Sequence, residues 1–131
     1  MASKTLLYNL SNPVGKSCPN CGDDVLLVRF FLRRISAAPD VRGPYSSMPL
    51  VPNYDPQLSE AIVWFQKQVA AAHCPITVDG RVDPAPHGQG IYTIRHLNFS
   101  YRKRYRQFEH RIEDDPIFPG QLRASFSSAH V

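Results

Sequence analysis

Three cysteines and one histidine are the side chains in this chain best suited to bind a metal ion. Cys18 and Cys21 form a Cys-Pro-Asn-Cys motif, and Cys74 directly follows His73. Thiolates and imidazoles are ligands that zinc prefers, so these four residues are weak candidates for a metal site. A zinc site usually has two spaced pairs of ligands, and adjacent residues rarely aim at one ion. We therefore expect reduced thiols, no metal and no cofactor, although a disulfide between Cys74 and either other cysteine stays open.

Other short patterns suggest catalysis or nucleotide binding less well. Gly15-Lys16-Ser17 resembles the end of a phosphate-binding loop, but that motif needs a glycine where this chain has Leu10. The five histidines are scattered without the spacing of a zinc peptidase. The acidic residues at 109 and 113–115 are typical of helix charges rather than of a glycosidase pair. We expect neither nucleotide binding nor enzymatic activity.

Length and composition place broad limits on the protein. A chain of 131 residues is near the usual length of one domain. It has no apolar run of about 18 residues, so we expect no membrane span. The first ten residues do not form a secretory signal, which predicts a cytoplasmic protein or export by a non-classical or secretion-system route. A formal charge of +4 favours acidic partners without selecting one.

Helical spacing accounts for most of the apolar residues. Residues 23–35 form one amphipathic stripe, which Asn20 or Asp23 can cap. A second helix follows Asp55-Pro56 and runs to about Ala72. A third begins near Gln89, and a fourth is predicted from the spacing of apolar residues over 101–112, ended by Asp115-Pro116. Because no strand-like alternation is present, the fold class is all-α.

The segments outside the helices are a lead-in, a long loop and a turn. Residues 1–17 form an extended lead-in, and residues 37–54 form a long proline-rich loop. Asp79-Gly80 is a strong turn signal, since glycine accepts a positive φ and aspartate bonds turn amides. Gln66 lies about 100° round the helix from the buried Phe65, where its amide can bond a loop backbone. We expect Val28, Leu32, Ile62, Phe65 and Leu97 to form the interior around Gly80.

Four stretches in this order resemble one known family. They are "VGKSCPNCGDDVLLVRFFLRRI", "EAIVWFQKQV", "VDGRVDP" and "YTIRHLN". Together, over residues 14–98, they resemble the peptidoglycan-binding-like domains, three-helix modules attached to many bacterial cell-wall hydrolases. The matching positions are Ala61, Ile62, Phe65, Gln66, Asp79, Gly80, Val82 and Leu97. The loop 37–54 and Leu58 replace a further turn and a threonine of the family, and the segment after Asn98 is additional.

The resemblance implies a fold and a division of the chain. It implies a three-helix bundle of the peptidoglycan-binding type with long loops and an additional C-terminal helix. Residues 1–98, with the lead-in 1–17, would form the domain. Residues 99–131 would form a helical extension and tail.

The resemblance also implies a function without catalysis. The chain would be a bacterial or phage-type binding module that recognises cell-wall peptidoglycan. Its contact residues would be Tyr54, Trp64, Asp79, Arg81, Asp83 and Tyr92.

The alternative is a protein-interaction or structural adaptor, or a secretion-associated protein, that has kept the fold without binding glycan. Its partner-binding residues would be Tyr101, Tyr105 and Phe108. Because these aromatic residues share one helical face, we expect them to pack against the bundle or, alternatively, against a protein partner, rather than to bind nucleic acid.

Overall fold

The protein is built from helices. The computed structural model describes residues 7–86 and 92–129, with only the backbone described from residue 125 onward. Four α-helices follow one another along the chain: α1 (Gly22–Ala37), α2 (Pro56–Ala71), α3 (Thr93–Arg104) and α4 (Gly120–Ala129). The described part contains no strand, and its only bridge pairs Val14 with Val82 in antiparallel fashion. The predicted all-α class is therefore confirmed, and no described helix is long and apolar enough to cross a membrane.

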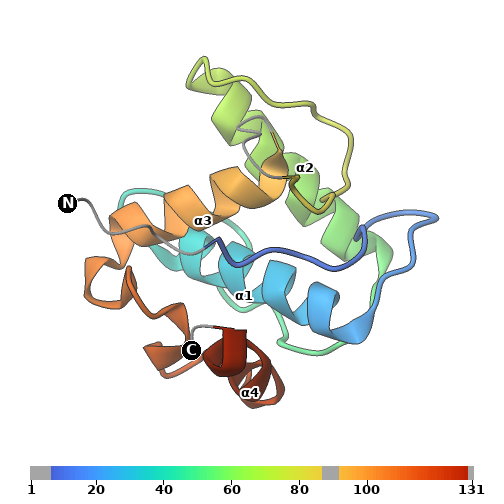
Figure 1. Cartoon of the computed structure of the whole chain (residues 1–131). Helices are drawn as coiled ribbons and strands as arrows, with labels where there is room; N and C mark the ends of the chain where they lie inside the picture. Colours follow the sequence, from blue (N-terminus) through green and yellow to red (C-terminus); the bar gives the residue numbers. More distant parts are fainter. Residues whose placement is uncertain (1–6, 87–91, 130–131) are drawn as a thin grey trace.

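Helix α1 lies at the centre of the molecule (Figure 1) and contacts α2, α3 and α4. Its residues from Asp24 to Leu32 are all buried, so its apolar surface is wider than a single amphipathic stripe. A helix covered on most sides is apolar almost all round, as expected for a buried element. The one charged side chain in the middle of this stretch, Arg29, is 2% exposed.

Arg29 holds the long loop between α1 and α2. Its Nη2 donates a 2.6 Å hydrogen bond to the carbonyl of Asn53, and it lies 3.5 Å from the carboxylate of Asp55. The predicted loop is thus present, and a buried arginine fixes its C-terminal end. The buried cation finds partners on the loop backbone, because a buried charge without a partner is very costly.

The two predicted helix caps have different outcomes. Asp55 caps α2 as predicted, because its Oδ1 accepts a 3.0 Å hydrogen bond from the amide of Leu58. The prediction for α1 is wrong: its N-cap is Cys21, without a side-chain bond. Asn20 instead exchanges hydrogen bonds with the backbone of Gly15, at 2.8 and 2.9 Å, and so closes the preceding loop.

The C-terminal third differs most from the prediction. A third helix was expected from near Gln89, which lies outside the described residues, and a fourth over 101–112. The structure instead has one helix, α3, that ends at Arg104 and is followed by two 3₁₀ turns, η1 (Arg106–Phe108) and η2 (Ile112–Asp114). The C-terminal helix is α4, which begins after Asp115-Pro116 rather than ending there.

Tertiary contacts explain why the helical spacing of residues 101–112 does not continue as a helix. The hydroxyl of Tyr105 donates a 2.5 Å hydrogen bond to the carbonyl of Arg34 on α1, and the hydroxyl of Tyr8 bonds Glu113. These bonds require the chain to turn after α3, and tertiary contacts of this kind routinely outweigh helix propensity.

One hydrophobic cluster joins all parts of the fold. The five predicted interior residues, Val28, Leu32, Ile62, Phe65 and Leu97, are all buried within it. The same cluster contains Ile112, Phe118 and Leu122 of the C-terminal segment. The predicted division between residues 98 and 99 falls inside α3, and residues on both sides of it contribute to one core.

A buried carboxylate ties the C-terminal segment to this core. Asp115 is 0% exposed and accepts two 2.7 Å hydrogen bonds from Arg34 and a 2.8 Å bond from the hydroxyl of Tyr101. Burial acts to raise the pKa of Asp115, but the bonds from Arg34, the amide of Ile117 and Tyr101 outweigh it and hold the pKa below its ordinary value. Asp115 is therefore an ionised internal anchor and not a helix-end charge.

Candidate functional site

The Asp79–Asp83 turn is held in place by one side chain from α2. The Oε1 of Gln66 accepts hydrogen bonds from the amides of Asp79 and Gly80, at 3.0 and 2.9 Å. Its Nε2 lies 3.0 Å from each of three acceptors, which are the carbonyl of Arg81, the carboxylate of Asp79 and the hydroxyl of Thr93. Gln66 is 0% exposed, so one buried neutral amide joins α2, the turn and the start of α3. The predicted bond from Gln66 to a loop backbone is confirmed.

The backbone of the turn has the conformation predicted for Asp79-Gly80. Gly80 has a φ of +74°, and a Cβ there would approach Val63 Cγ2 to 3.2 Å. Asp79 Oδ1 accepts a 3.0 Å hydrogen bond from the amide of Arg81. A residue with a side chain is strained at this φ, so glycine is the residue that allows Gln66 to reach both amides.

Beyond the turn the chain pairs with the lead-in. Val82 and Val14 exchange two backbone hydrogen bonds, of 2.8 and 2.9 Å, and both side chains are fully buried. Gln66 and this bridge fix the turn from both of its ends. The side chains that the turn presents to solvent therefore project from a rigid backbone.

A small cavity of about 150 Å³ opens beside the turn. It is lined by Thr77, Asp79, Arg81, Asp83, Tyr92 and Thr93, which we call the turn site. Four of the six predicted ligand residues, namely Asp79, Arg81, Asp83 and Tyr92, are thus brought together. A shallower hollow of about 400 Å³ lies on the other side of Asp79 and Arg81 and includes Lys16, Ser59 and Glu60.

Arg81 and Asp83 form an ion pair at the mouth of the turn site. Arg81 Nη2 and Nε donate to Asp83 Oδ1 at 2.7 and 3.1 Å. This hydrogen bond raises the pKa of the Arg81 guanidinium, which stays charged. Both side chains are well exposed, at 44% and 37%, and an exposed pair of this kind stabilises little. A ligand carboxylate can therefore replace Asp83 as the partner of Arg81.

The other two predicted ligand residues lie elsewhere. The hydroxyl of Tyr54 is 2.6 Å from the hydroxyl of Ser59, which donates to the carbonyl of Gly80 at 3.3 Å, so Tyr54 only supports the turn. Trp64 packs edge-on against Tyr45, with ring centroids 5.5 Å apart, and lines a different cavity. Trp64 thus lies against the α1–α2 loop and not at the turn site, because its position on α2 turns it toward that loop.

The predicted partner-binding aromatic residues also point inward. Tyr101 is 0% exposed and bonds Asp115, and Tyr105 stacks on it with a centroid separation of 5.1 Å. Phe108 is half-buried and packs against the core. Tyr101 is thus a core residue, and a partner has no access to its ring. The aromatic face therefore packs against the helix bundle, which was the other expectation for it.

The cysteines do not form a metal site within the described residues. All three are free, and Cys21 and Cys74 are exposed. Among the residues described, no group of three or more cysteine, histidine or acidic side chains could hold a metal ion. His73 has a positive φ of 62° in the turn that follows α2, which is a structural position at a helix end.

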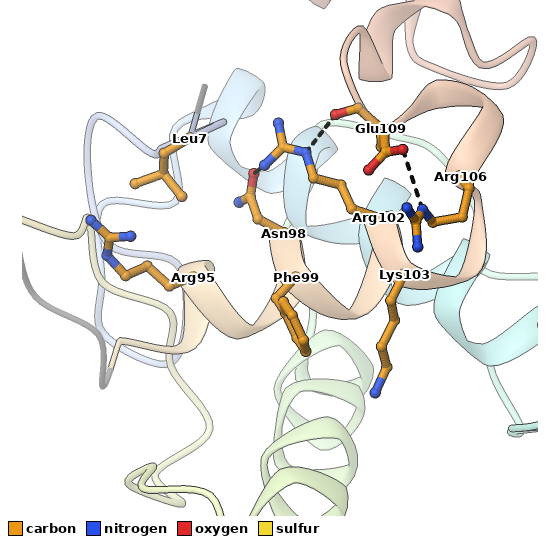
Figure 2. A pocket seen from close by; sticks show the side chains of 8 residues that line it. All are labelled: Leu7, Arg95, Asn98, Phe99, Arg102, Lys103, Arg106 and Glu109. Atoms are coloured by element: carbon orange, nitrogen blue, oxygen red, sulfur yellow. Dashed lines mark hydrogen bonds and ion pairs between the residues drawn. The ribbon is translucent and has the colours of Figure 1, made fainter. Parts of the chain in front are cut away.

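Sequence reasoning did not identify the outer face of α3. This face has a hollow of about 390 Å³. The side chains that line it, drawn in Figure 2, are those of Leu7, Arg95, Asn98, Phe99, Arg102, Lys103, Arg106 and Glu109. The available signal was the basic and aromatic composition of "RHLNFSYRKRYR", but its aromatic residues were all assigned to one face. Phe99 is the aromatic residue that leaves that face, and it is 66% exposed.

No family model, no curated protein and no solved structure matches the chain.

Proposed function

We propose that the chain is a non-catalytic binding module of the bacterial or phage type that recognises cell-wall peptidoglycan at the turn site. The observation that carries the proposal is the buried Gln66, which fixes the turn so that Arg81, Asp83 and Tyr92 surround one cavity. The three-helix arrangement of the peptidoglycan-binding type belongs to the same proposal, because the matching motif residues Gln66, Asp79 and Gly80 all act in this turn.

The chemistry of the turn site suits a glycan that carries peptides. The ring of Tyr92 offers an apolar face for a sugar, and Thr77 and Thr93 supply hydroxyls that bond sugar hydroxyls. Arg81 is the cation for a stem-peptide carboxylate, which would take the place of Asp83. The shallow hollow beside Lys16 gives a longer chain room to continue.

Co-sedimentation with purified sacculi at low salt tests the proposal. Arg81→Ala removes the cation and should weaken binding, whereas Asp83→Asn removes the competing carboxylate and should strengthen it. Arg111→Ala is the matched control, because Arg111 is also an exposed arginine that pairs with nearby carboxylates, those of Asp114 at 3.3 Å and Glu113 at 3.7 Å. Opposite changes for the two turn-site variants, with no change for the control, are the expected result.

Two outcomes would overturn parts of the proposal. If the wild-type protein stays in the supernatant, wall binding is wrong and the adaptor function takes its place. If sacculi retain the protein but all three variants bind like the wild type, the wall is the ligand and the turn site is not its binding site.

A further inference from the structure

Phe99 lies on a ridge between two hollows. It has the highest exposed fraction of the exposed large apolar side chains among the described residues, at 66% against 42% for Val78 and 40% for Val51. Its ring, together with Lys103, lines both the hollow on the outer face of α3 and a second cavity between α3 and α2. Figure 2 shows both side chains directed toward the α2 side of the helix. An exposed aromatic ring between two cavities is typical of an interaction surface.

The hollow on the outer face is basic. Arg95, Phe99 and Lys103 are spaced at i, i+4 and i+8, so they form one row along α3. The Lys103 ammonium lies 5.4 Å from the centroid of Phe99. Arg106 adds a further, exposed cation, which pairs with the half-buried side chain of Glu109 at 3.2 Å. We call the hollow lined by these residues the basic hollow.

Arg95 is a cation in this row with few hydrogen bonds to the rest of the protein. Its Nε is covered by protein and has no hydrogen-bond partner. Arg102, in contrast, donates to the carbonyl of Glu109 at 2.8 Å and to Asn98 at 3.2 Å. Arg102 therefore holds the end of α3, whereas Arg95 and Lys103 remain for an external anion.

The second cavity is largely apolar, although Gln68, Lys103 and Arg104 also line it. It has a volume of about 180 Å³, and its walls include Val41, Trp64, Phe65 and Val69. Cys74 and His96 lie at the same cavity, and His96 Nε2 is 2.9 Å from the carbonyl of Pro75, which fixes that end. We call this cavity the apolar groove. It is large enough for one or two apolar side chains of a partner.

We propose that this surface binds an acidic amphipathic segment of a protein partner. The apolar side chains of the segment would enter the apolar groove over Phe99, and its carboxylates would face Arg95, Lys103 and Arg106. Charge complementarity supports an acidic partner, and the apolar groove next to the cations supports one that is also apolar on one side. The inference is independent of wall binding, because the basic hollow and the apolar groove share no residue with the turn site.

Two features favour a protein segment over single-stranded nucleic acid. Binding sites for single strands combine cations with several stacking rings, whereas Phe99 is the only exposed ring among the described residues that line the basic hollow. The second feature is the wall formed by Val41, Trp64 and Val69 in the apolar groove, which suits apolar side chains of a protein better than a phosphate chain.

Peptide selection with a fluorescence readout tests the proposal. The whole protein is immobilised and a random peptide library is selected on it; the enriched sequences should combine Asp or Glu with large apolar residues at helical spacing. Their binding is then titrated through Trp64, the only tryptophan of the chain, which lies in the apolar groove. The affinity should fall with rising salt concentration, since the charges involved are solvent-exposed.

Variants of exposed residues distinguish binding at the proposed surface from non-specific binding. Phe99→Ser should weaken binding of the selected peptides about tenfold or more, and Lys103→Glu should weaken it several-fold. Val78→Ser and Lys67→Glu are the matched controls, because each makes the same kind of change at an exposed position outside this surface.

Three results would overturn the proposal. The first is enrichment of no peptide, or of peptides without acidic residues. The second is equal affinity of the wild type and Phe99→Ser. The third is tighter binding of a single-stranded oligonucleotide than of the selected peptides with the same dependence on Lys103, which would make the surface a nucleic-acid site.

Discussion

Two buried polar clusters hold this small fold together, and they differ in charge. At the turn site, Gln66 joins α2, the turn and α3 with a neutral amide. At the other end of the molecule, Asp115 joins the C-terminal segment to α1 and α3 with an ionised carboxylate. Both side chains are 0% exposed, and each makes several hydrogen bonds.

This difference in charge suits the two clusters to different roles. The Gln66 amide is neutral and does not titrate, so it holds the turn in one geometry at any pH, while Arg81 and Asp83 face the solvent. In the Asp115 cluster, the ion pair with Arg34 offsets the cost of burying the carboxylate, and the cluster stabilises the fold only while that carboxylate is ionised. The turn is thus a rigid support for an exposed site, and the Asp115 cluster is an internal lock for the chain end.

Removal of the charged anchor should have the largest effect on stability. Asp115→Ala leaves Arg34, which is 24% exposed, without its partner and Tyr101 with an unsatisfied hydroxyl, and we expect a loss of about 3 kcal/mol in the free energy of unfolding. Urea denaturation measures this loss. Asp114→Asn is the control, since Asp114 is exposed and pairs only with the exposed Arg111, and it should behave like the wild type. Equal effects of both variants would contradict the internal role of Asp115.

Removal of the neutral anchor should cost less but should change the turn more. Gln66→Ala leaves the amides of Asp79 and Gly80 without their acceptor, which should cost about 2 kcal/mol. Hydrogen exchange of these two amides should accelerate more than exchange in α1. Gln68→Ala, an exposed glutamine two positions along α2, should leave both quantities unchanged. Exchange at 79 and 80 that keeps its wild-type rate would show that Gln66 does not hold the turn.

A methyl group on the turn glycine should have a smaller effect. Gly80→Ala places a side chain at a φ of +74° and 3.2 Å from Val63, at a cost of about 1–2 kcal/mol. Gly120→Ala is the control, because a Cβ at that position meets nothing within 4 Å. Thermal unfolding of both variants gives the comparison, and a Gly80→Ala protein as stable as the control would exclude strain at the turn.

Lowering the pH should give the smallest of these differences in stability between the two clusters. The pKa of Asp115 is lower in the folded protein than its ordinary value of 3.8, so its contribution to stability is complete above that value and is lost as the pH falls through the folded pKa. The slope from this one proton cannot exceed about 1.4 kcal/mol per pH unit. Asp115→Asn should remove that part of the acid dependence, whereas Gln66→Ala should retain it. Because Asp40 also has a lowered pKa, only the difference between wild type and Asp115→Asn tests the assignment. Parallel acid profiles for these two proteins would refute it.

The parts of the site that could be predicted depend on contacts that local chemistry specifies. Asp79-Gly80 is a turn in many contexts, and Gln66 lies only 13 and 14 residues from the amides that it binds. The position of Trp64 could not be predicted in the same way. Helical spacing places it beside Phe65, but only the path of the loop 37–54 decides that Tyr45 and not the turn lies against its ring.

The C-terminal segment shows the same limit for the fold. Helical spacing over 101–112 predicts one helix, and the chain instead makes two 3₁₀ turns. The partners responsible are distant, since Arg34 and Asp115 are 81 residues apart and Tyr8 and Glu113 are 105 apart. No pattern within a helix-length window contains these pairs, so the segment's carboxylates look like surface charges in the sequence.

The sequence by itself determined the all-α class, the five residues of the central core, the cap of α2 and the Gln66-supported turn, because periodicity, capping and turn chemistry act over short stretches of chain. Only the tertiary structure decided which of the aromatic and charged side chains are buried. It placed Tyr101 and Asp115 inside the protein and left Phe99 outside, since their environments depend on where α1 and the C-terminal segment meet. The contacts between α1 and the C-terminal segment join residues far apart in the chain. Such contacts stabilise the protein only when the whole core has formed.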